Sequence, residues 1–343
     1  MPRSTAIRRP SLAAAALAVL LLAACDSTPR ADSRQDERTL VRSGRGTSSE
    51  RAAEVRVAEA TALKDQGIDE RALAEFERAI EENPDLTVAY MGAADIYRER
   101  GDYTSAERRY REATELEPRN FEAQYYLGLC LQLLDRAAEA VRVYLTALAL
   151  RPDDFDANLN LATAYIQLDE PAQARPYAER AVRIRPDDGP ARVNLGAVYA
   201  DLEEHGSAVV EYRQAAELME LSPELLLNLA ESLGRTGRYA EMSATLEQAV
   251  RIEPSPIAYE RLGSALFRLK DYDASLDAFR DAAELDAGHY PAWNGVGVCL
   301  LNRYLWSERR DESALRGALE ALRRSLQIRP NQPKIVELLR RYG

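Results

Sequence analysis

The chain has 343 residues, of which 46% are hydrophobic, 29% charged and only 7% aromatic. It is therefore too long for one small domain and too apolar to be disordered throughout. The formal net charge is −11, and an acidic surface repels a phosphate backbone, so nucleic-acid binding is not expected. Two histidines and three cysteines leave few ligands for a metal site or for thiol chemistry. We expect no catalytic residues, no metal and no cofactor.

The segment 1–24 is predicted to form an export signal. Residues 1–10 contain three arginines and no acid, and residues 11–24 read SLAAAALAVLLLAA. This apolar run is shorter than the roughly 20 residues that cross a bilayer. A basic start, a short apolar stretch and small residues at its end are typical of a secretory signal peptide.

The end of that signal indicates attachment to a membrane. Leu22-Ala23-Ala24-Cys25 resembles the lipobox of bacterial lipoproteins, which implies cleavage before Cys25 and fatty chains (diacylglycerol, palmitate) on the new N-terminus. Two or three acyl chains anchor a protein stably. The alternative is a plain signal peptide with an incidental cysteine. We expect the rest of the chain on the periplasmic face, and Asp26 slightly favours the inner over the outer membrane.

Residues 25–52 are expected to be the lipidated cysteine and a flexible linker. Residues 26–50 are rich in Ser, Arg and Asp and have almost no large apolar side chains, so they cannot offset the entropy of ordering. The Arg-Gly pairs of residues 42–46 leave contact with an acidic surface as an alternative.

From about residue 53 the sequence has a 34-residue period. Small residues recur in three series in step with an aromatic or bulky series and a proline series. The prolines are Pro84, Pro118, Pro152, Pro186 and, two periods on, Pro254. Within one period, apolar residues at i, i+3 and i+4 predict two amphipathic helices separated by a turn. One such pair cannot bury both of its faces, so the pairs must stack into an all-α solenoid.

The period resembles the tetratricopeptide repeat. Residues 121–154 carry the fullest match. They place Leu127-Gly128, Ala140, Tyr144, Ala147 and Pro152 where that family has its pattern. The resemblance implies a right-handed superhelix of about eight units over 53–332. The predicted units are 53–86, 87–120, 121–154, 155–188, 189–222, 223–255, 256–289 and 290–332, and residues 333–343 are predicted to form a capping helix.

In this family the first helix of each unit lines the concave surface. The sixth place of three consecutive units is asparagine: Asn160, Asn194 and Asn228. A column of amides can bond to the backbone of an extended peptide. It is similar to the asparagine column in the repeat region of O-linked N-acetylglucosamine transferase. The alternative is a polar, solvated helix position. The other inward candidates are Tyr125, Tyr126, Leu159, Val193 and Leu227.

The eighth unit contains a nine-residue extension with Tyr304 and Trp306. Exposed aromatics are favoured at binding hot spots, so this is a candidate docking surface. Packing of these rings over a lengthened loop is the alternative.

These features favour a non-enzymatic, membrane-anchored scaffold that binds peptides or partner proteins of the cell envelope, with no small-molecule substrate. A second hypothesis is an assembly factor of an envelope machine, because lipoproteins of this repeat class resemble pilotins and exopolysaccharide-export scaffolds. A third is the substrate-binding subunit of a transferase, and a fourth, a cytoplasmic adaptor, requires an uncleaved signal. The partner, the oligomeric state and the pathway are not specified by the sequence.

Overall fold

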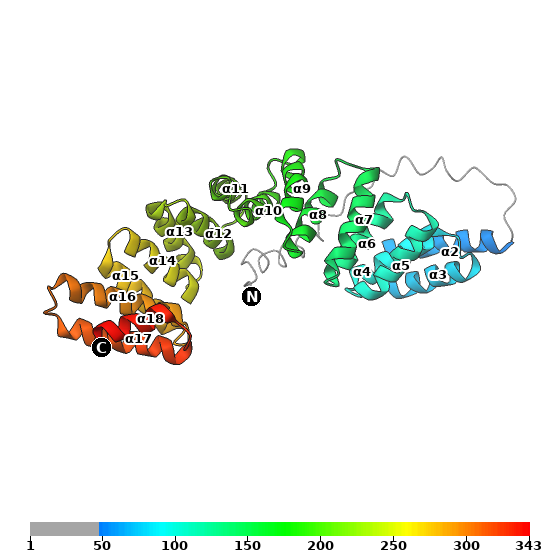
Figure 1. Ribbon diagram of the computed structural model, residues 1–343. Helices are drawn as coiled ribbons and strands as arrows, with labels where there is room; N and C mark the ends of the chain where they lie inside the picture. The colour runs from blue at the N-terminus through cyan, green and yellow to red at the C-terminus, as the bar shows by residue number, and fades with distance from the viewer. Residues whose placement is uncertain (1–47) are drawn as a thin grey trace, which may run out of the picture. The chain divides into compact units, whose positions relative to one another are not determined.

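The computed structural model describes residues 48–343, in which all regular structure is helical (Figure 1). The expected signal peptide, Cys25 and linker residues 25–47 lie outside the described residues. The described helices fall into two compact units, which divide between Val198 and Tyr199. The N-terminal unit contains α2 (Ser48–Asp65), α3 (Asp69–Glu82), α4 (Thr87–Glu99), α5 (Tyr103–Leu116), α6 (Phe121–Leu133), α7 (Ala137–Leu150), α8 (Phe155–Gln167), α9 (Pro171–Ile184) and most of α10 (Gly189–Asp201).

The C-terminal unit begins with the last turn of α10. Its other helices are α11 (His205–Leu218), α12 (Pro223–Arg235), α13 (Tyr239–Ile252), α14 (Pro256–Arg268), α15 (Tyr272–Leu285), α16 (Tyr290–Trp306), α17 (Glu312–Ile328) and α18 (Pro333–Tyr342). The predicted fold class is confirmed, because the described chain is an array of eight helix pairs followed by a C-terminal helix.

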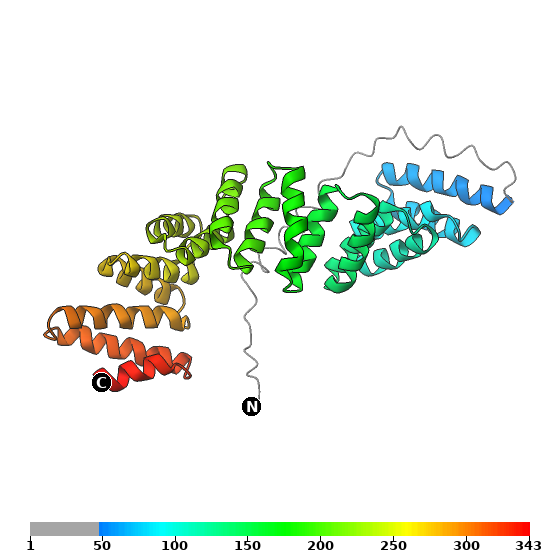
Figure 2. The same cartoon turned by 45° about the horizontal axis from the view of Figure 1, so that its top comes forward.

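The helix pairs follow the predicted period closely. The first helices α4, α6, α8, α10, α12 and α14 each have 13 residues, and the second helices of the first seven pairs each have 14. Within the pairs that lie inside one unit, the two helices contact one another side by side, as α2 and α3 do in Figure 2.

Helix ends are fixed by short polar residues. Asp154 accepts a hydrogen bond from the backbone nitrogen of Ala157 at 2.9 Å, and Asp188 accepts one from Ala191 at 2.8 Å. These carboxylates satisfy backbone N–H groups that have no partner inside the helix. The aspartates that follow the repeat proline are therefore helix caps.

The turn inside each pair requires a left-handed residue. Gly101 has φ +77°, as expected for a glycine that ends a helix. The same place in other pairs is filled by residues with side chains, and Lys270 has φ +67°. The backbone path of the repeat therefore imposes this conformation even where the sequence supplies no glycine.

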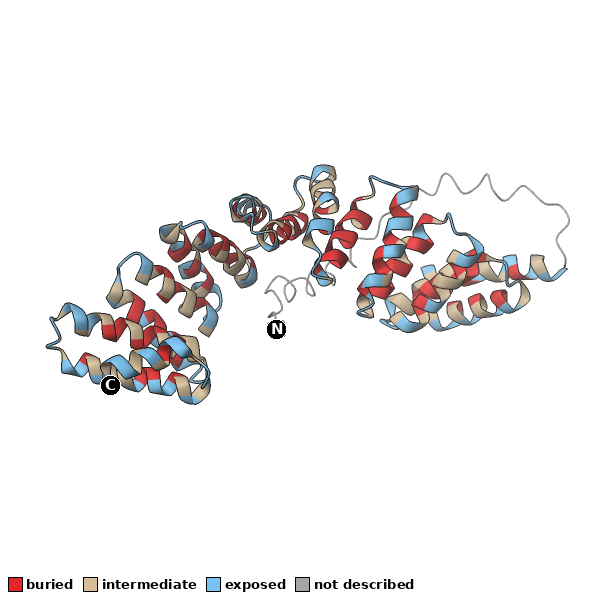
Figure 3. Cartoon of the chain, in the orientation of Figure 1, coloured by how far each residue is buried: buried red, intermediate tan, exposed pale blue. Residues whose placement is uncertain are grey.

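Small residues and large rings interlock in the core of the N-terminal unit. Tyr110 and Tyr144 are fully buried. A Cβ on Gly128 would lie 2.6 Å from the ring of Tyr144, so only glycine allows α6 to pack this closely on α7. Figure 3 shows the buried residues in red along the helices, and in α8 every residue from Ala157 to Ile166 is buried.

The C-terminal unit ends in a longer pair. Both α16 and α17 have 17 residues, so the nine-residue extension adds about one turn to each helix and lengthens their connection. Cys299 is buried in this core and Cys130 in that of the N-terminal unit, where each acts as a small core residue. The final helix α18 packs on α17 through the buried side chain of Ile335.

One boundary differs from the prediction. Helix α2 begins at Ser48, five residues inside the stretch expected to be linker. Glu50 lies in its first turn, where an acidic side chain favours a helix start. Over residues 48–343, no helix is both long and apolar enough to cross a membrane.

Candidate binding surface on the first helices

Two of the three predicted asparagines bond back to the preceding first helix. In α8, Asn160 Nδ2 donates a hydrogen bond to the hydroxyl of Tyr125 in α6 at 3.0 Å. In α10, Asn194 Nδ2 donates to Oγ1 of Thr163 in α8 at 2.8 Å. We call Tyr125, Tyr126, Asn160, Thr163 and Asn194 the polar strip. Its side chains lie on three successive first helices of the N-terminal unit.

The exposure of these amides corrects one part of the sequence expectation. Asn160 is 3% exposed and Asn194 is 4% exposed, so neither is a solvated amide. Asn194 Oδ1 is buried and has no hydrogen-bond partner among the described residues. Asn228 in α12 of the C-terminal unit is half-buried. The first two amides therefore join neighbouring helices, and a peptide-binding role for the three stays a prediction.

Three of the other inward candidates also pack inside the protein. Leu159 and Val193 are 9% and 6% exposed, and Leu159 lies in a core cluster with Ala191 of the next first helix. Leu227 is half-buried against the cluster that contains Leu226. Leu159 and Val193 are therefore largely covered by the protein, and their role in binding a ligand stays a prediction.

Tyr125 and Tyr126 both keep part of their surface exposed. Their rings contact each other edge to face with centroids 5.1 Å apart. Tyr126 also stacks on the ring of Tyr110 at 5.7 Å, and the guanidinium of Arg98 lies over Tyr126 at 4.8 Å from its centroid. Tyr126 is thus held between a buried ring and a cation.

A network of charged and polar side chains contacts Tyr126 through Arg98. The hydroxyl of Tyr110 donates to Asp95 Oδ1 at 2.5 Å and accepts from Arg98 Nε at 3.2 Å. Burial acts to lower the pKa of Arg98, but Tyr110 and Asp95 outweigh it, and the pKa lies above its ordinary value. Burial, with the charge of Asp95, raises the pKa of Tyr110 well above its ordinary value. The phenol therefore stays protonated and Arg98 charged.

The sequence interpretation missed these charged residues. Lys64 Nζ lies 3.5 Å from Asp95 Oδ2 and 3.2 Å from Glu99 Oε1, so it extends the network to α2. Lys64 and Arg98 stand one repeat period apart. A basic residue at the same place in two consecutive units is the signal that could have revealed the network.

The two aromatic residues of the nine-residue extension differ in their solvent exposure. Tyr304 is partly buried and packs on the core of the last pair. Trp306 is 75% exposed, and its ring lies 6.3 Å from that of Tyr272. Tyr304 therefore packs, and a docking role stays a prediction that concerns Trp306.

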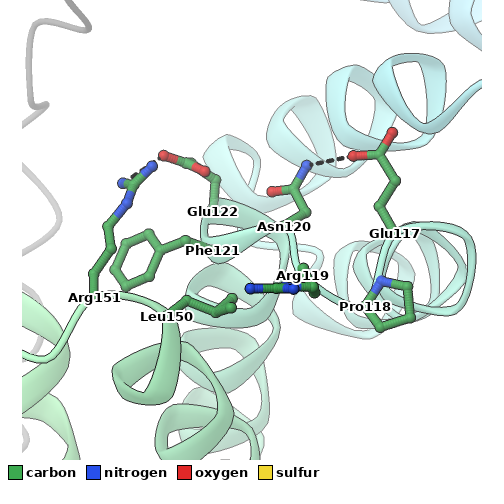
Figure 4. A pocket seen from close by; sticks show the side chains of 8 residues that line it. All are labelled: Glu117, Pro118, Arg119, Asn120, Phe121, Glu122, Leu150 and Arg151. Carbon is green, nitrogen blue, oxygen red and sulfur yellow. Dashed lines mark hydrogen bonds and ion pairs between the residues drawn. The ribbon is translucent and has the colours of Figure 1, made fainter.

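One further hollow is lined by residues that pair with one another. Figure 4 shows a pocket at the junction of α5, α6 and α7, where Arg151 forms an ion pair with Glu122 at 2.7 Å and lies over the ring of Phe121 at 4.3 Å. Arg185 lies in the same way over Phe155, so this pairing recurs in the next unit. Within residues 48–343, no cluster of three or more His, Cys, Asp or Glu side chains is placed to hold a metal ion.

The helix pairs, their period and the interlocked small and aromatic residues define a helical repeat array. Two family models described as tetratricopeptide repeat match the chain, one over residues 57–106, 91–155 and 227–290 and the other over 131–199. The chain belongs to the tetratricopeptide repeat family.

Individual relatives share the fold more than the sequence. The small glutamine-rich tetratricopeptide repeat-containing protein 2 of Mycosarcoma maydis is 30% identical over 120 residues, so the match spans about a third of that relative, 34% of each chain. A tetratricopeptide repeat protein of Parabacteroides merdae is 16% identical, with a TM-score of 0.50 over 73% of this chain and 99% of that one. YrrB, described as a repeat protein with an unusual peptide-binding site, is 21% identical, with a TM-score of 0.49 over 58% and 98%.

Proposed function

We propose that this protein is a non-enzymatic scaffold that binds an extended peptide, or a peptide segment of a partner protein, along the first helices of its N-terminal unit. Stacked helix pairs leave extended surfaces on their first helices, and repeat proteins use such surfaces for binding. The fold alone does not choose a ligand, so the support comes from the side chains of the surface.

The observation that carries the proposal is the fixed, half-exposed ring of Tyr126. Stacking on Tyr110 and the cation of Arg98 already hold the ring in place. A side chain that is ordered before binding loses less conformational entropy when a ligand arrives. Tyrosine in such a setting is enriched among residues that dominate binding energy.

The charged side chains around the ring of Tyr126 are paired with one another. We therefore expect the surface to recognise the shape and the backbone of a peptide more than its net charge. Lys64 of α2 pairs with Asp95 and Glu99 of α4, and Arg98 pairs with the same two carboxylates within α4. Because these pairs neutralise one another, they add little long-range attraction for either sign of charge. Sequence-tolerant binding of weak to moderate affinity is the expected behaviour.

Selection of peptides on the full chain tests the proposal. Random dodecamer peptides displayed on phage are selected against the wild-type protein, and the affinities of the selected peptides are measured by fluorescence anisotropy. Tyr126→Ala should weaken binding by about tenfold or more, as expected for a hot-spot residue. Tyr103→Ala is the matched control, since Tyr103 starts the second helix α5. Equal loss in both variants would contradict a site on the first helices.

We propose further that the scaffold is anchored to a bacterial membrane on its periplasmic face, with the inner membrane slightly favoured over the outer. The support is the basic start, the short apolar run and Leu22-Ala23-Ala24-Cys25. These residues lie outside the described part of the chain, so the proposal rests on sequence alone.

A further inference from the structure

A second site lies in the C-terminal unit, away from the polar strip in sequence. A pocket of about 390 Å³ opens between the first helices α14 and α16, and Phe279 of α15 also lines it. Its lining includes Glu260, Ser264 and Phe267 of α14, and Asn294 and Val298 of α16. Glu260 and Asn294 each occupy the fifth place of their helix, one repeat period apart. The repeat thus brings a carboxylate and an amide to one hollow.

Glu260 forms no ion pair with any residue of the described part of the chain. The described residues offer it a single hydrogen bond, from the hydroxyl of Ser264 at 3.3 Å, and no ion pair. The adjacent Arg261 is directed elsewhere, because it bonds to the backbone oxygen of Leu227 and to Glu231, each at 3.1 Å. Arg268 also lines the pocket, and its guanidinium lies over the ring of Tyr239, 5.7 Å from the ring centroid. Burial raises the pKa of Glu260 despite the nearby charges of His289 and Arg261.

Asn294 presents an unpaired oxygen because its orientation is fixed. Gln332 Nε2 donates to the oxygens of Ser325 and to the backbone oxygen of Arg329, so Gln332 Oε1 must face the other way. Asn294 Nδ2 donates to that Oε1 at 2.8 Å. A flipped amide would set two acceptors against each other. Asn294 Oδ1 is therefore left buried without a hydrogen-bond partner among the described residues, a state that costs free energy until a donor reaches it.

The pocket is kept open between aromatic and aliphatic walls. The ring of Phe279 fills the space beside Gly295, where a Cβ would lie 2.2 Å from a ring carbon. Phe267 and Val298 provide further apolar lining. The hollow thus combines two hydrogen-bond acceptors, one of them negatively charged, with walls suited to a hydrocarbon chain.

We propose that this pocket binds a primary ammonium group on an alkyl stem, presented by a lysine side chain of a bound peptide. The ammonium donates to the carboxylate of Glu260 and to Oδ1 of Asn294, and the methylene groups pack against Phe267 and Phe279. This inference rests on the proposed peptide-binding function and adds a preference for lysine in the segment that reaches the C-terminal unit.

Peptides that differ at one side chain test the proposal on the full chain. Fluorescein-labelled peptides of alanine, serine and glycine carry one central lysine, acetyl-lysine or arginine, and binding is followed by anisotropy. The lysine peptide should bind about tenfold more tightly than the acetyl-lysine peptide, which keeps the stem and loses the charge. Glu260→Gln should remove that difference, and Glu253→Gln, an exposed residue before α14, should keep it. Circular dichroism checks that both variants fold.

A free diamine separates this proposal from peptide binding itself. If wild type binds no peptide but binds cadaverine, and Glu260→Gln abolishes that binding, the ammonium site stands and the peptide-binding function fails. If peptides bind but Glu260→Gln leaves the lysine preference unchanged, the ammonium site is wrong and peptide binding stands. A preference for the arginine peptide that depends on Glu260, or binding of neither lysine peptide nor cadaverine, also overturns the ammonium assignment.

Discussion

Asn160 Nδ2 donates a hydrogen bond to the hydroxyl oxygen of Tyr125, 35 residues earlier, at 3.0 Å. This bond joins α8 to α6 at the level of the polar strip, so it couples the stacking of units to the placement of the candidate binding residues. Asn160 was predicted from the sequence to bind a ligand, and in the structure its amide links two helices of the protein itself.

The Asn160–Tyr125 bond should contribute measurably to stability. Asn160→Ala and Tyr125→Phe each remove it, and their interaction free energy in a double-mutant cycle should be about 0.5–1.5 kcal/mol. Urea unfolding followed by circular dichroism measures each variant. Strictly additive effects of the two substitutions would show that the bond makes no net contribution.

Lys270 should be replaceable by glycine with a gain in stability. Its φ of +67° is a conformation that glycine adopts without the steric cost borne by a side chain. Lys270→Gly is expected to raise the free energy of unfolding by about 0.5–1 kcal/mol. Gly101→Ala, at the equivalent position of the turn between α4 and α5 with φ +77°, should lower it by a similar amount or more. Changes of the same sign in the two variants would refute the turn argument.

Gly295 should tolerate no side chain. The Cβ of Gly295→Ala would lie 2.2 Å from the ring of Phe279, so we expect a loss of about 1–3 kcal/mol in thermal or urea unfolding. Gly206→Ala is the contrasting variant, because open space surrounds that helical position. It should be neutral or stabilising by up to about 1 kcal/mol. A stable Gly295→Ala protein would contradict this expectation and would mean that the ring of Phe279 can move away from position 295.

Ionisation of Glu260 should destabilise the ligand-free protein. Burial raises its pKa, so the folded state holds this proton at pH values where the unfolded state has released it. Stability is therefore expected to fall as pH rises from the ordinary glutamate range through the raised pKa. Glu260→Gln removes this component, and its thermal midpoint should exceed that of wild type above that range. Because His289 and Arg261 also act on Glu260, the test is the difference between the two pH profiles; a flat difference contradicts it.

Cys25 should determine membrane association. Cys25→Ala removes the thiol that would carry the lipid, so the protein should move from the membrane fraction to the soluble fraction of the bacterium and lose incorporation of labelled palmitate. Ser27→Ala is a matched control two residues on. Unchanged fractionation of the Cys25 variant would rule out the lipid anchor.

The features that depend on the spacing of residues along the chain could be predicted from the sequence. The repeat period predicted the helix pairs, and first helices begin at Thr87, Phe121 and Phe155 because the caps and turns recur with that period. The burial and hydrogen bonding of individual side chains could not be predicted from the repeat period. The burial of Asn160 depends on a hydroxyl 35 residues away, and Leu159 is covered by the next unit.

The pocket at Glu260 illustrates the same limit. Glu260 and Asn294 are ordinary polar residues in their own helices, and nothing local marks them as a pair. Their juxtaposition comes from the stacking of α14 and α16, and the orientation of Asn294 from Gln332 beyond the next helix. A comparison of residues at equal places in consecutive units would have shown the pair, as it would have shown Lys64 and Arg98.

Site-specific photo-crosslinking tests the central claim most directly. A photoreactive phenylalanine analogue replaces Tyr126 on the first helix α6 or, in a second protein, Arg108 on the exposed side of the second helix α5. Each is irradiated with a peptide selected on the wild-type chain, and adducts are measured by mass spectrometry. Binding along the first helices predicts an adduct at position 126 and none at 108. Equal labelling at both positions, or labelling at 108 alone, would contradict it.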